Sequence, residues 1–330
     1  MKRVRTIGLL MLLVLLIGSA LVVTLGRSRP SPVGFQAVVE MALDAQRDLD
    51  QVGKQATRIS EADEMRLGEE IARRARQWWP MASSDVQDYV REVGRRLARH
   101  VRRPGIRYTF HVIDDGLVNA FALPGGQIFL MRGMLQFVET EAELAAVLGH
   151  EIAHVDLRHC IDLFHYELLV KKVAGAAGRV FGGDLTEFVI QATGQIGVLV
   201  HRILTMGYQK QLEFDADEQG WSLAVAAGYD PEAAMATFAR LDDQFGGSAS
   251  PRPPPRNPAA EIAGAIRTAA GSYFHSHPPT IERLRHLRQV KQANAAGLAG
   301  QRFYIGRWNL RHLTPRSREE RSTSDEFRTY

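Results

Sequence analysis

Residues 140–156 read TEAELAAVLGHEIAHVD, and this stretch decides both the expected fold and the expected chemistry. Thr140, followed three residues later by Glu143, is typical of a capping box at the start of a helix. The apolar side chains then recur at helical spacing. They are Leu144, Val147, Leu148, Ile152 and Val155. We therefore predict a helix that starts at Thr140 and carries the second half of the stretch in its middle.

The five residues from His150 to His154 read HEIAH. Two histidines four residues apart project from the same face of a helix, so both imidazoles can reach one metal ion, and Glu151 lies beside it. This is the minimal set of groups for a zinc hydrolase. The alternative is an ordinary helix whose histidines lie in the core or at the surface.

A catalytic zinc site needs a third protein ligand and keeps a fourth position open. Residues 211–218, QLEFDADE, begin a second predicted helix, which Gly228 ends. Its Glu213 and Asp217 share one face, so one carboxylate can complete a His₂Glu ligand set while the other holds the far nitrogen of a histidine ligand. The alternative is a solvated acidic face that complements the helix dipole.

Together these motifs resemble the family of zinc metallopeptidases that includes the heat-shock membrane protease HtpX, the type I CAAX prenyl proteases and bacterial periplasmic relatives. Three further segments match the pattern: NAFALPGG at 119–126, His159 after the HEIAH motif, and SHPP at 276–279 with Arg283. The resemblance covers roughly residues 58–290. It implies an α+β fold, mostly helical, with a small β-sheet whose edge strand flanks the active-site helix.

The resemblance also implies roles for single residues. His150, His154 and Glu213 bind one zinc ion per chain, and Glu151 is general base and then acid. Asp217 and Arg283 support these ligands from behind. His277 approaches the metal from a loop, either as a catalytic group that stabilises the oxyanion or as a ligand that caps the zinc in a latent state.

Substrate contact has its own candidate segment. Residues 106–113, 118–123 and 127–131 are predicted strands, with turns at the glycines between them. In the family the middle strand is an edge beside the zinc, and an edge binds an extended peptide through its backbone. This makes Asn119, Ala120 and Phe121 the predicted substrate-binding residues. The alternative is an ordinary three-stranded meander.

The N-terminus predicts a membrane segment. Lys2, Arg3 and Arg5 precede an uncharged run from Ile7 to Leu25, and 19 helical residues span about 28 Å, close to the thickness of a bilayer core. Residues 1–26 are thus a transmembrane anchor or a signal peptide. The basic N-terminus predicts a single-pass protein of the bacterial inner membrane with a periplasmic catalytic domain. The alternative is an exported soluble protein after signal cleavage.

Three further regions follow. Residues 27–57 are predicted as a linker with an amphipathic helix, 58–290 as the metallopeptidase domain, and 291–330 as a partly disordered C-terminal extension. The formal net charge of +4 comes with many carboxylates among the arginines, which argues against a nucleic-acid partner. The oligomeric state has no signal in the sequence.

The predicted function is that of a membrane-tethered zinc endopeptidase that degrades misfolded or unassembled envelope proteins. The alternative is a chaperone-like binding module that keeps the fold and cleaves little. An intact Glu151 argues against this alternative, because a binding module has no use for a carboxylate beside the metal.

Overall fold

The computed structural model describes residues 59–162, 210–245, 277 and 281–330. All of them belong to one unit, which runs from Ile59 to Tyr330. The predicted anchor or signal peptide at 1–26 and the predicted linker and helix at 27–57 lie outside the described residues.

In the part of the chain that the structure describes, two helices precede the sheet. Helix α3 spans Glu61–Trp78, and the side chain of Ser60 caps it by accepting a hydrogen bond from the Asp63 amide. Helix α4 spans Ser84–Ala98 and buries one apolar face. Ser83 is its cap residue, and the Gln87 side chain bonds the backbone of Val112 in the sheet.

Within the described residues the sheet has three strands, β1 (Thr109–Ile113), β2 (Ala120–Leu123) and β3 (Gln127–Met131). Their order is β1-β3-β2, with β1 parallel and β2 antiparallel to β3. This order excludes a simple meander and makes β2 an edge strand, as predicted. The short 3-10 turn between β2 and β3 needs glycine at Gly126, where φ is 85° and a Cβ would lie 2.6 Å from the Arg107 carbonyl oxygen.

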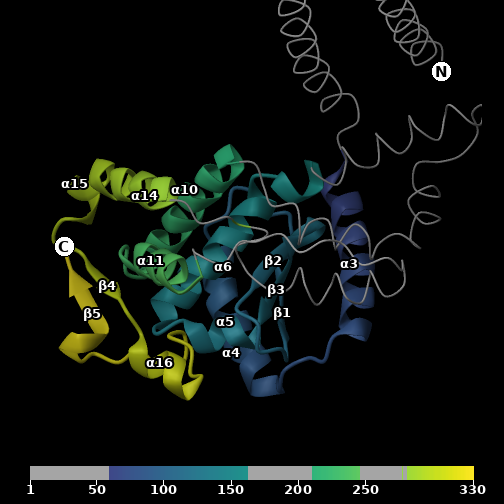
Figure 1. The fold of residues 1–330 in the computed structure, drawn as a ribbon, viewed down its shortest axis with the longest axis horizontal. Coiled ribbons are helices and arrows are strands. Elements are labelled where there is room, and N and C mark those ends of the chain that lie inside the picture. The colour runs from purple at the N-terminus through teal and green to yellow at the C-terminus, as the bar shows by residue number, and fades with distance from the viewer. Residues whose placement is uncertain (1–58, 163–209, 246–276, 278–280) are drawn as a thin grey trace, which may run out of the picture. The chain divides into compact units, whose positions relative to one another are not determined.

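After β3, the short helix α5 (Arg132–Phe137) leads into helix α6, which spans Glu141–Asp156 and is buried along its whole length. Thr140 caps it as predicted, accepting a hydrogen bond from the Glu143 amide. Helix α6 packs between the sheet on one side and helices α10 (Lys210–Ala226) and α11 (Ala233–Phe245) on the other (Figure 1). One apolar core surrounds α6, and a second lies between the sheet and α3. The mostly helical α+β class is confirmed.

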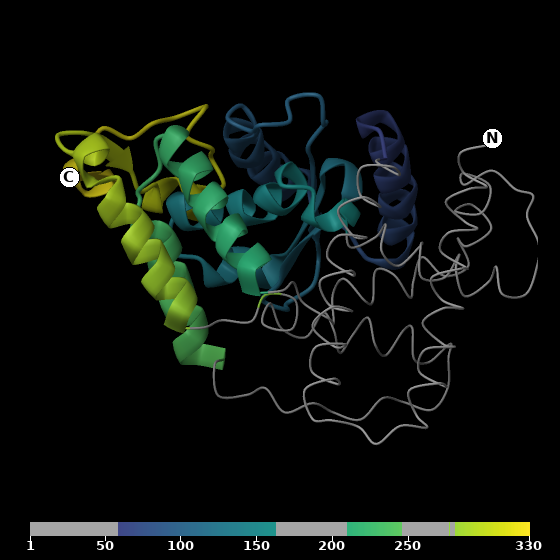
Figure 2. The ribbon, with the colours of Figure 1, turned by 90° about the horizontal axis from the view of Figure 1, so that it is seen from above.

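Residues 281–330 add three helices and a small second sheet. These are α14 (Ile281–Ala293), α15 (Ala295–Leu298), β4 (Arg302–Tyr304), α16 (Arg307–His312) and β5 (Phe327–Thr329). Strands β4 and β5 pair antiparallel. Figures 1 and 2 both show this sheet at the end of the unit opposite α3.

The partial disorder predicted for residues 291–330 is not seen in the structure. The segment carries its own apolar anchors, with Phe303, Tyr304 and Leu310 buried, so ordering it removes apolar surface from water. It also caps α6, because the first two amides of that helix donate to the carbonyl oxygens of Gly306 and Ile305 at 3.1 and 3.0 Å. The tail is mostly polar, so its composition did not indicate that its few apolar residues would be buried.

Glu141, the first residue of α6, joins four parts of the fold. Its buried carboxylate accepts hydrogen bonds from the Tyr89 hydroxyl at 3.1 Å, the Tyr229 hydroxyl at 2.9 Å and the Arg316 amide at 3.1 Å. Burial raises the pKa of this carboxyl to about 6, against the opposing effect of these bonds. The start of the active-site helix is thereby held from three sides.

Candidate active site

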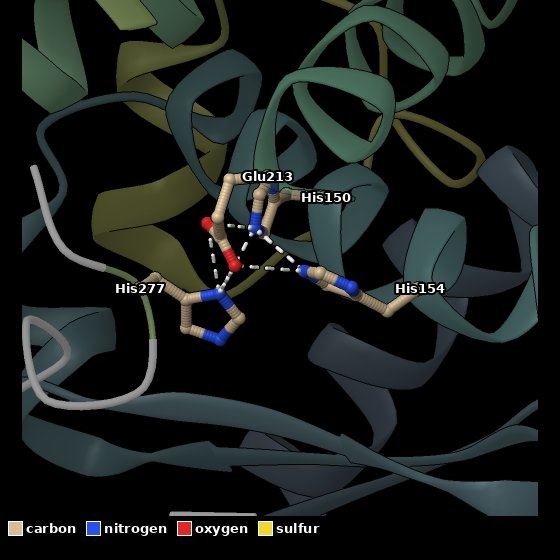
Figure 3. A group of neighbouring side chains, drawn as sticks. All are labelled: His150, His154, Glu213 and His277. Carbon is tan, nitrogen blue, oxygen red and sulfur yellow. Dashed lines mark hydrogen bonds and ion pairs between the residues drawn. The ribbon is translucent and has the colours of Figure 1, made fainter. Parts of the chain in front are cut away.

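The two histidines of the HEIAH motif lie on the same face of α6, as the spacing predicts. Their Nε2 atoms are 3.1 Å apart, and both side chains are buried (Figure 3). Two ring nitrogens that converge in this way can bind one cation together.

Helix α10 supplies the third group. The Glu213 carboxylate lies 3.5 Å from Nε2 of His150 and 3.5 Å from Nε2 of His154. Asp217, one turn further along, lies behind His150, with 3.0 Å between its Oδ1 and the ring Nδ1. The structure therefore brings both predicted carboxylates to the histidines, Glu213 in front and Asp217 behind.

Two glycines allow α6 and α10 to approach this closely. A Cβ on Gly149 would lie 2.8 Å from the Gly220 carbonyl oxygen, and a Cβ on Gly220 would lie 2.7 Å from the His150 amide nitrogen. The two backbones therefore touch at the crossing, next to the first histidine of the motif. Any larger residue at either position would push Glu213 away from the histidines.

His277 joins the cluster from a distant part of the chain. Its Nδ1 lies 3.1 Å from Nε2 of His150 and 3.0 Å from Oε1 of Glu213. Its Nε2 lies 3.4 Å from Oε1 of Glu151. The ring thus contacts both the nitrogen and oxygen atoms that could bind a metal and the carboxylate of the motif.

These four side chains fit a zinc ion. One donor atom each from His150, His154, Glu213 and His277 lies within 4.8 Å of the other three, and all four residues are buried. Zinc takes nitrogen and oxygen ligands at about 2.0–2.1 Å in a tetrahedron, which implies about 3.3 Å between ligand atoms. Five of the contacts between these donor atoms run from 3.0 to 3.5 Å, with Glu213 facing His150 through Oε2 and the other two rings through Oε1. Donor type and spacing both match.

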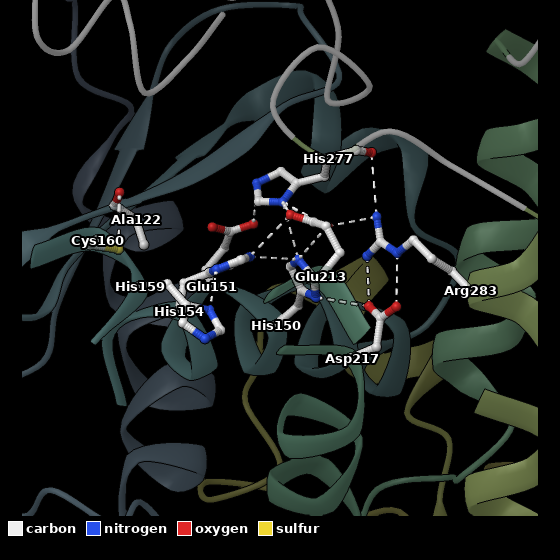
Figure 4. Close-up of polar contacts among 10 residues, drawn as sticks. All are labelled: Ala122, His150, Glu151, His154, His159, Cys160, Glu213, Asp217, His277 and Arg283. Carbon is white, nitrogen blue, oxygen red and sulfur yellow. Dashed lines mark hydrogen bonds and ion pairs between the residues drawn. The ribbon is translucent and has the colours of Figure 1, made fainter. Parts of the chain in front are cut away.

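Arg283 on α14 holds the carboxylates (Figure 4). Its Nε and Nη2 donate to the two oxygens of Asp217 at 2.8 and 2.6 Å, and Nη1 lies 2.9 Å from Oε2 of Glu213. Nη1 also donates to the backbone carbonyl of His277 at 3.4 Å. The guanidinium thus links both acidic residues to the segment that carries His277.

The charges of the cluster shift several pKa values. Burial opposes a charge on His150, but Asp217 and Glu213 outweigh it and raise the pKa of this imidazole to about 9. Burial and the neighbouring His150 hold the pKa of His154 well below its usual range. Burial would raise the pKa of Glu213, yet His277 and Arg283 hold it well below normal. Without metal, the carboxylates of Glu213 and Asp217 stay ionised, and the His150 ring is protonated on both nitrogens and positively charged.

Glu151 stands apart from this network. Its carboxylate is buried, and among the described residues neither oxygen has a hydrogen-bond partner. Its Oε1 lies 3.4 Å from His277 Nε2. Burial raises its pKa. Buried carboxylate oxygens rarely lack partners, so these two point to a place for water or substrate.

The predicted substrate-binding residues lie on or next to β2 and are all buried. The Asn119 side chain accepts a hydrogen bond from the Ala120 amide at 2.8 Å. Phe121 stacks on Phe129 of β3, in the core under α3 and away from the histidines. The Phe121 side chain therefore cannot contact a substrate. At this residue only the backbone of the strand edge could do so.

Sequence reasoning missed the positioning glycines Gly149 and Gly220 and the buried Glu141. A glycine within a helical pattern is a signal for close packing, but it does not say against what. Glu141 had no signal, because an acidic residue in the first turn of a helix is commonplace.

The fold and the site together define a metallopeptidase of the HExxH class. Residues 84–291 match the family described as peptidase family M48, and the chain belongs to this family. The metallopeptidase family expected from the sequence is thereby confirmed at the level of family M48. The finer resemblance, to HtpX, the prenyl proteases and most closely the singly anchored bacterial periplasmic members, remains a prediction.

Several curated proteins are similar to this chain. The mitochondrial metalloendopeptidase OMA1 of Schizosaccharomyces pombe is 32% identical over 156 residues, 47% of this chain and 43% of that protein. OMA1 of Arabidopsis thaliana is 27% identical over 203 residues, covering 62% and 36%. The beta-barrel assembly-enhancing protease of Escherichia coli is 27% identical over 203 residues, covering 58% and 40%. The chain spans less than half the length of these relatives.

These comparisons correct the predicted location, a single-pass protein of the bacterial inner membrane with a periplasmic catalytic domain. Two of the similar proteins are named as mitochondrial enzymes. In the described part of the chain, no helix combines the length and apolar character that a membrane crossing requires. The apolar run at 7–25, on which the prediction rested, lies outside that part.

Proposed function

We propose that the chain is a zinc-dependent endopeptidase that hydrolyses peptide bonds in polypeptide substrates. The observation that carries this proposal is the convergence of Glu213 on the two histidines of the motif, with 3.5 Å from its oxygens to each Nε2. His150, His154 and Glu213 would hold the metal. A bound zinc ion would supply Lewis acidity, which activates water near pH 7 and polarises the peptide carbonyl.

Glu151 would handle the proton. As general base it takes a proton from the attacking water, and as general acid it passes that proton to the leaving amine. Its location supports this role, since its buried oxygens have no hydrogen-bond partner among the described residues and face His277 Nε2 at 3.4 Å. The raised pKa of a buried carboxyl also suits a group that must accept and release a proton near neutrality.

His277 has two possible roles, and the contacts of its ring favour one. Its Nδ1 lies among the donor atoms, 3.1 Å from His150 and 3.0 Å from Glu213, as a fourth ligand in a resting state would. A role in stabilising the oxyanion requires the ring to leave that position first. We propose the resting ligand as its role in this state, with Asp217 and Arg283 supporting the ligands from behind.

The edge of β2 would bind the substrate backbone. The Met131 amide donates to the Asn119 carbonyl, so these two residues form a hydrogen-bonded pair of the ladder. Such pairs alternate with non-bonded pairs along an antiparallel ladder, and the backbone N–H and C=O groups of Ala120 and Ala122 therefore point away from β3. An extended peptide can pair with these groups whatever its side chains are. In this structure, the Ala120 amide is occupied by the Asn119 side chain.

Recognition through the backbone suits extended, unfolded chains better than folded ones. The name of the Escherichia coli relative, a beta-barrel assembly-enhancing protease, supports a link to the assembly of beta-barrel proteins. We therefore propose unfolded or misassembled polypeptides, envelope proteins among them, as the substrates.

The test combines zinc analysis with cleavage of casein, an unfolded substrate, with and without chelator. Glu151→Gln removes the proton carrier but no ligand, so zinc content should stay while cleavage falls by about a hundredfold or more. Glu218→Gln is the matched control, because this carboxylate on α10 is exposed and its one ion-pair-distance contact among the described residues is the His286 ring at 3.7 Å. Undiminished cleavage by the Glu151 variant would refute the mechanism, and a wild-type chain that binds zinc without cleaving would favour the binding module.

A further inference from the structure

Each histidine of the motif has a partner behind it, on the side away from the cluster. For His150 the partner is the carboxylate of Asp217, 3.0 Å from the ring Nδ1. For His154 the partner is another imidazole: its Nδ1 lies 3.0 Å from Nδ1 of His159 (Figure 4). The two rings meet edge to face, with centroids 5.1 Å apart and an angle of 66°.

A left-handed turn brings His159 to this place. Helix α6 ends at Asp156, and Arg158 adopts a φ of 68°, which non-glycine residues rarely do. The Arg158 side chain is held by the Ile59 carbonyl at 3.2 Å and by Glu64 at 3.7 Å. The chain therefore reverses after α6, and the next residue, His159, is buried against His154. A strained backbone held by two contacts indicates that the location of the ring matters.

The direction of the hydrogen bond follows from the chemistry of imidazole. A neutral ring carries its hydrogen on one nitrogen only, and the other is free to bind a metal. If Nε2 of His154 faces the metal, its Nδ1 must carry the hydrogen and donate it. His159 must then accept at Nδ1 and stay uncharged.

We propose that His159 is a positioning residue for the metal site, which accepts the Nδ1 hydrogen of His154 and thereby presents its Nε2 to the zinc. This inference rests on the proposed metal site at His150, His154 and Glu213. It gives the site two different supports, a carboxylate behind one histidine and a neutral ring behind the other.

The charge balance explains why the second support is neutral. The buried site already contains the carboxylates of Glu151, Glu213 and Asp217. Among the described residues, Arg283 is the one arginine that forms ion pairs with this group, to Glu213 and Asp217. A further carboxylate behind His154 would add a buried negative charge, and the described residues place no cation beside it, which makes such a charge costly. An imidazole supplies the acceptor without adding charge.

Zinc affinity of the full chain, measured by competition with a chelator, tests this role. His159→Leu removes the acceptor and keeps the volume, and His159→Asn retains an acceptor oxygen near the place of Nδ1. Loss of such a supporting partner typically weakens metal binding about 10–100-fold. We expect that loss for the leucine variant and at most about a threefold change for asparagine.

His111→Leu is the matched control. His111 is also buried and also makes one ring hydrogen bond, at 2.8 Å to Gln127, but it lies on β1 and outside the metal cluster. Its variant should lose comparable thermal stability and keep wild-type zinc affinity. If His159→Leu does not fold, His159→Ala takes its place.

Four results would count against the inference. Wild-type affinity in His159→Leu would remove the role, and equal weakening in His159→Asn would show that the acceptor atom is not what matters. If His111→Leu weakened zinc binding as much as His159→Leu, the loss of affinity would be due to general destabilisation of the fold. A wild-type chain that binds no zinc would overturn the proposed function itself, and this inference with it.

Discussion

Replacing Arg283 with methionine should destabilise the metal-free protein strongly. The guanidinium is buried and makes two hydrogen bonds to Asp217, at 2.8 and 2.6 Å, and an ion pair to Glu213 at 2.9 Å. It also holds the backbone of His277. Methionine fills the space but leaves two buried carboxylates without the guanidinium that pairs with both.

The expected loss is large because the two carboxylates are buried. Breaking a buried ion pair by removing one partner costs about 3–5 kcal/mol of unfolding free energy. For a unit of this size each kcal/mol lowers the midpoint of thermal unfolding by about 2–4 °C, so a fall of about 6–20 °C is expected. Urea unfolding of chelated protein at pH 7 measures the free energy directly.

Two companion measurements test the reasoning. Zinc brings positive charge next to Glu213, so the loss in Arg283→Met should be smaller in zinc-loaded protein than in chelated protein. The double variant Arg283→Met with Asp217→Asn should recover part of the loss, since the amide carries no charge. A loss below about 1 kcal/mol in the metal-free protein, or a double variant no more stable than the single one, would refute this account of Arg283.

Three further predictions concern the metal ligands. Glu213→Ala should abolish stoichiometric zinc, whereas Glu218→Ala should retain it; equal zinc contents in the two variants would remove Glu213 from the ligand set. Because Asp217 and Glu213 outweigh burial and raise the pKa of His150 to about 9, zinc must expel a proton below that pH. Zinc affinity should therefore rise about tenfold per unit from about pH 6 to 8 and level off above 9, and a flat profile measured by chelator competition would contradict it. His277→Ala should raise basal casein cleavage with zinc retained; a fall of about a hundredfold would show instead that this ring serves the chemistry.

The sequence by itself determined the local parts of the site. The helix from Thr140, the shared face of His150 and His154, and the glutamate between them follow from helical spacing and capping, which are properties of neighbouring residues. The second helix and the edge position of the middle strand were also predicted from sequence and the resemblance it carries. Both are present.

Tertiary structure alone decided how these parts meet. The Gly149–Gly220 contact sets the distance between α6 and α10 and so brings Glu213 to the histidines, while Glu218 on the same helix stays exposed. Only packing shows that His159 turns back onto His154. The polar C-terminal segment caps the active-site helix because its few apolar residues find partners far away in the chain. Contacts of this kind join residues that are far apart in the sequence, and the local periodicity of a segment does not indicate which distant residues it will pack against.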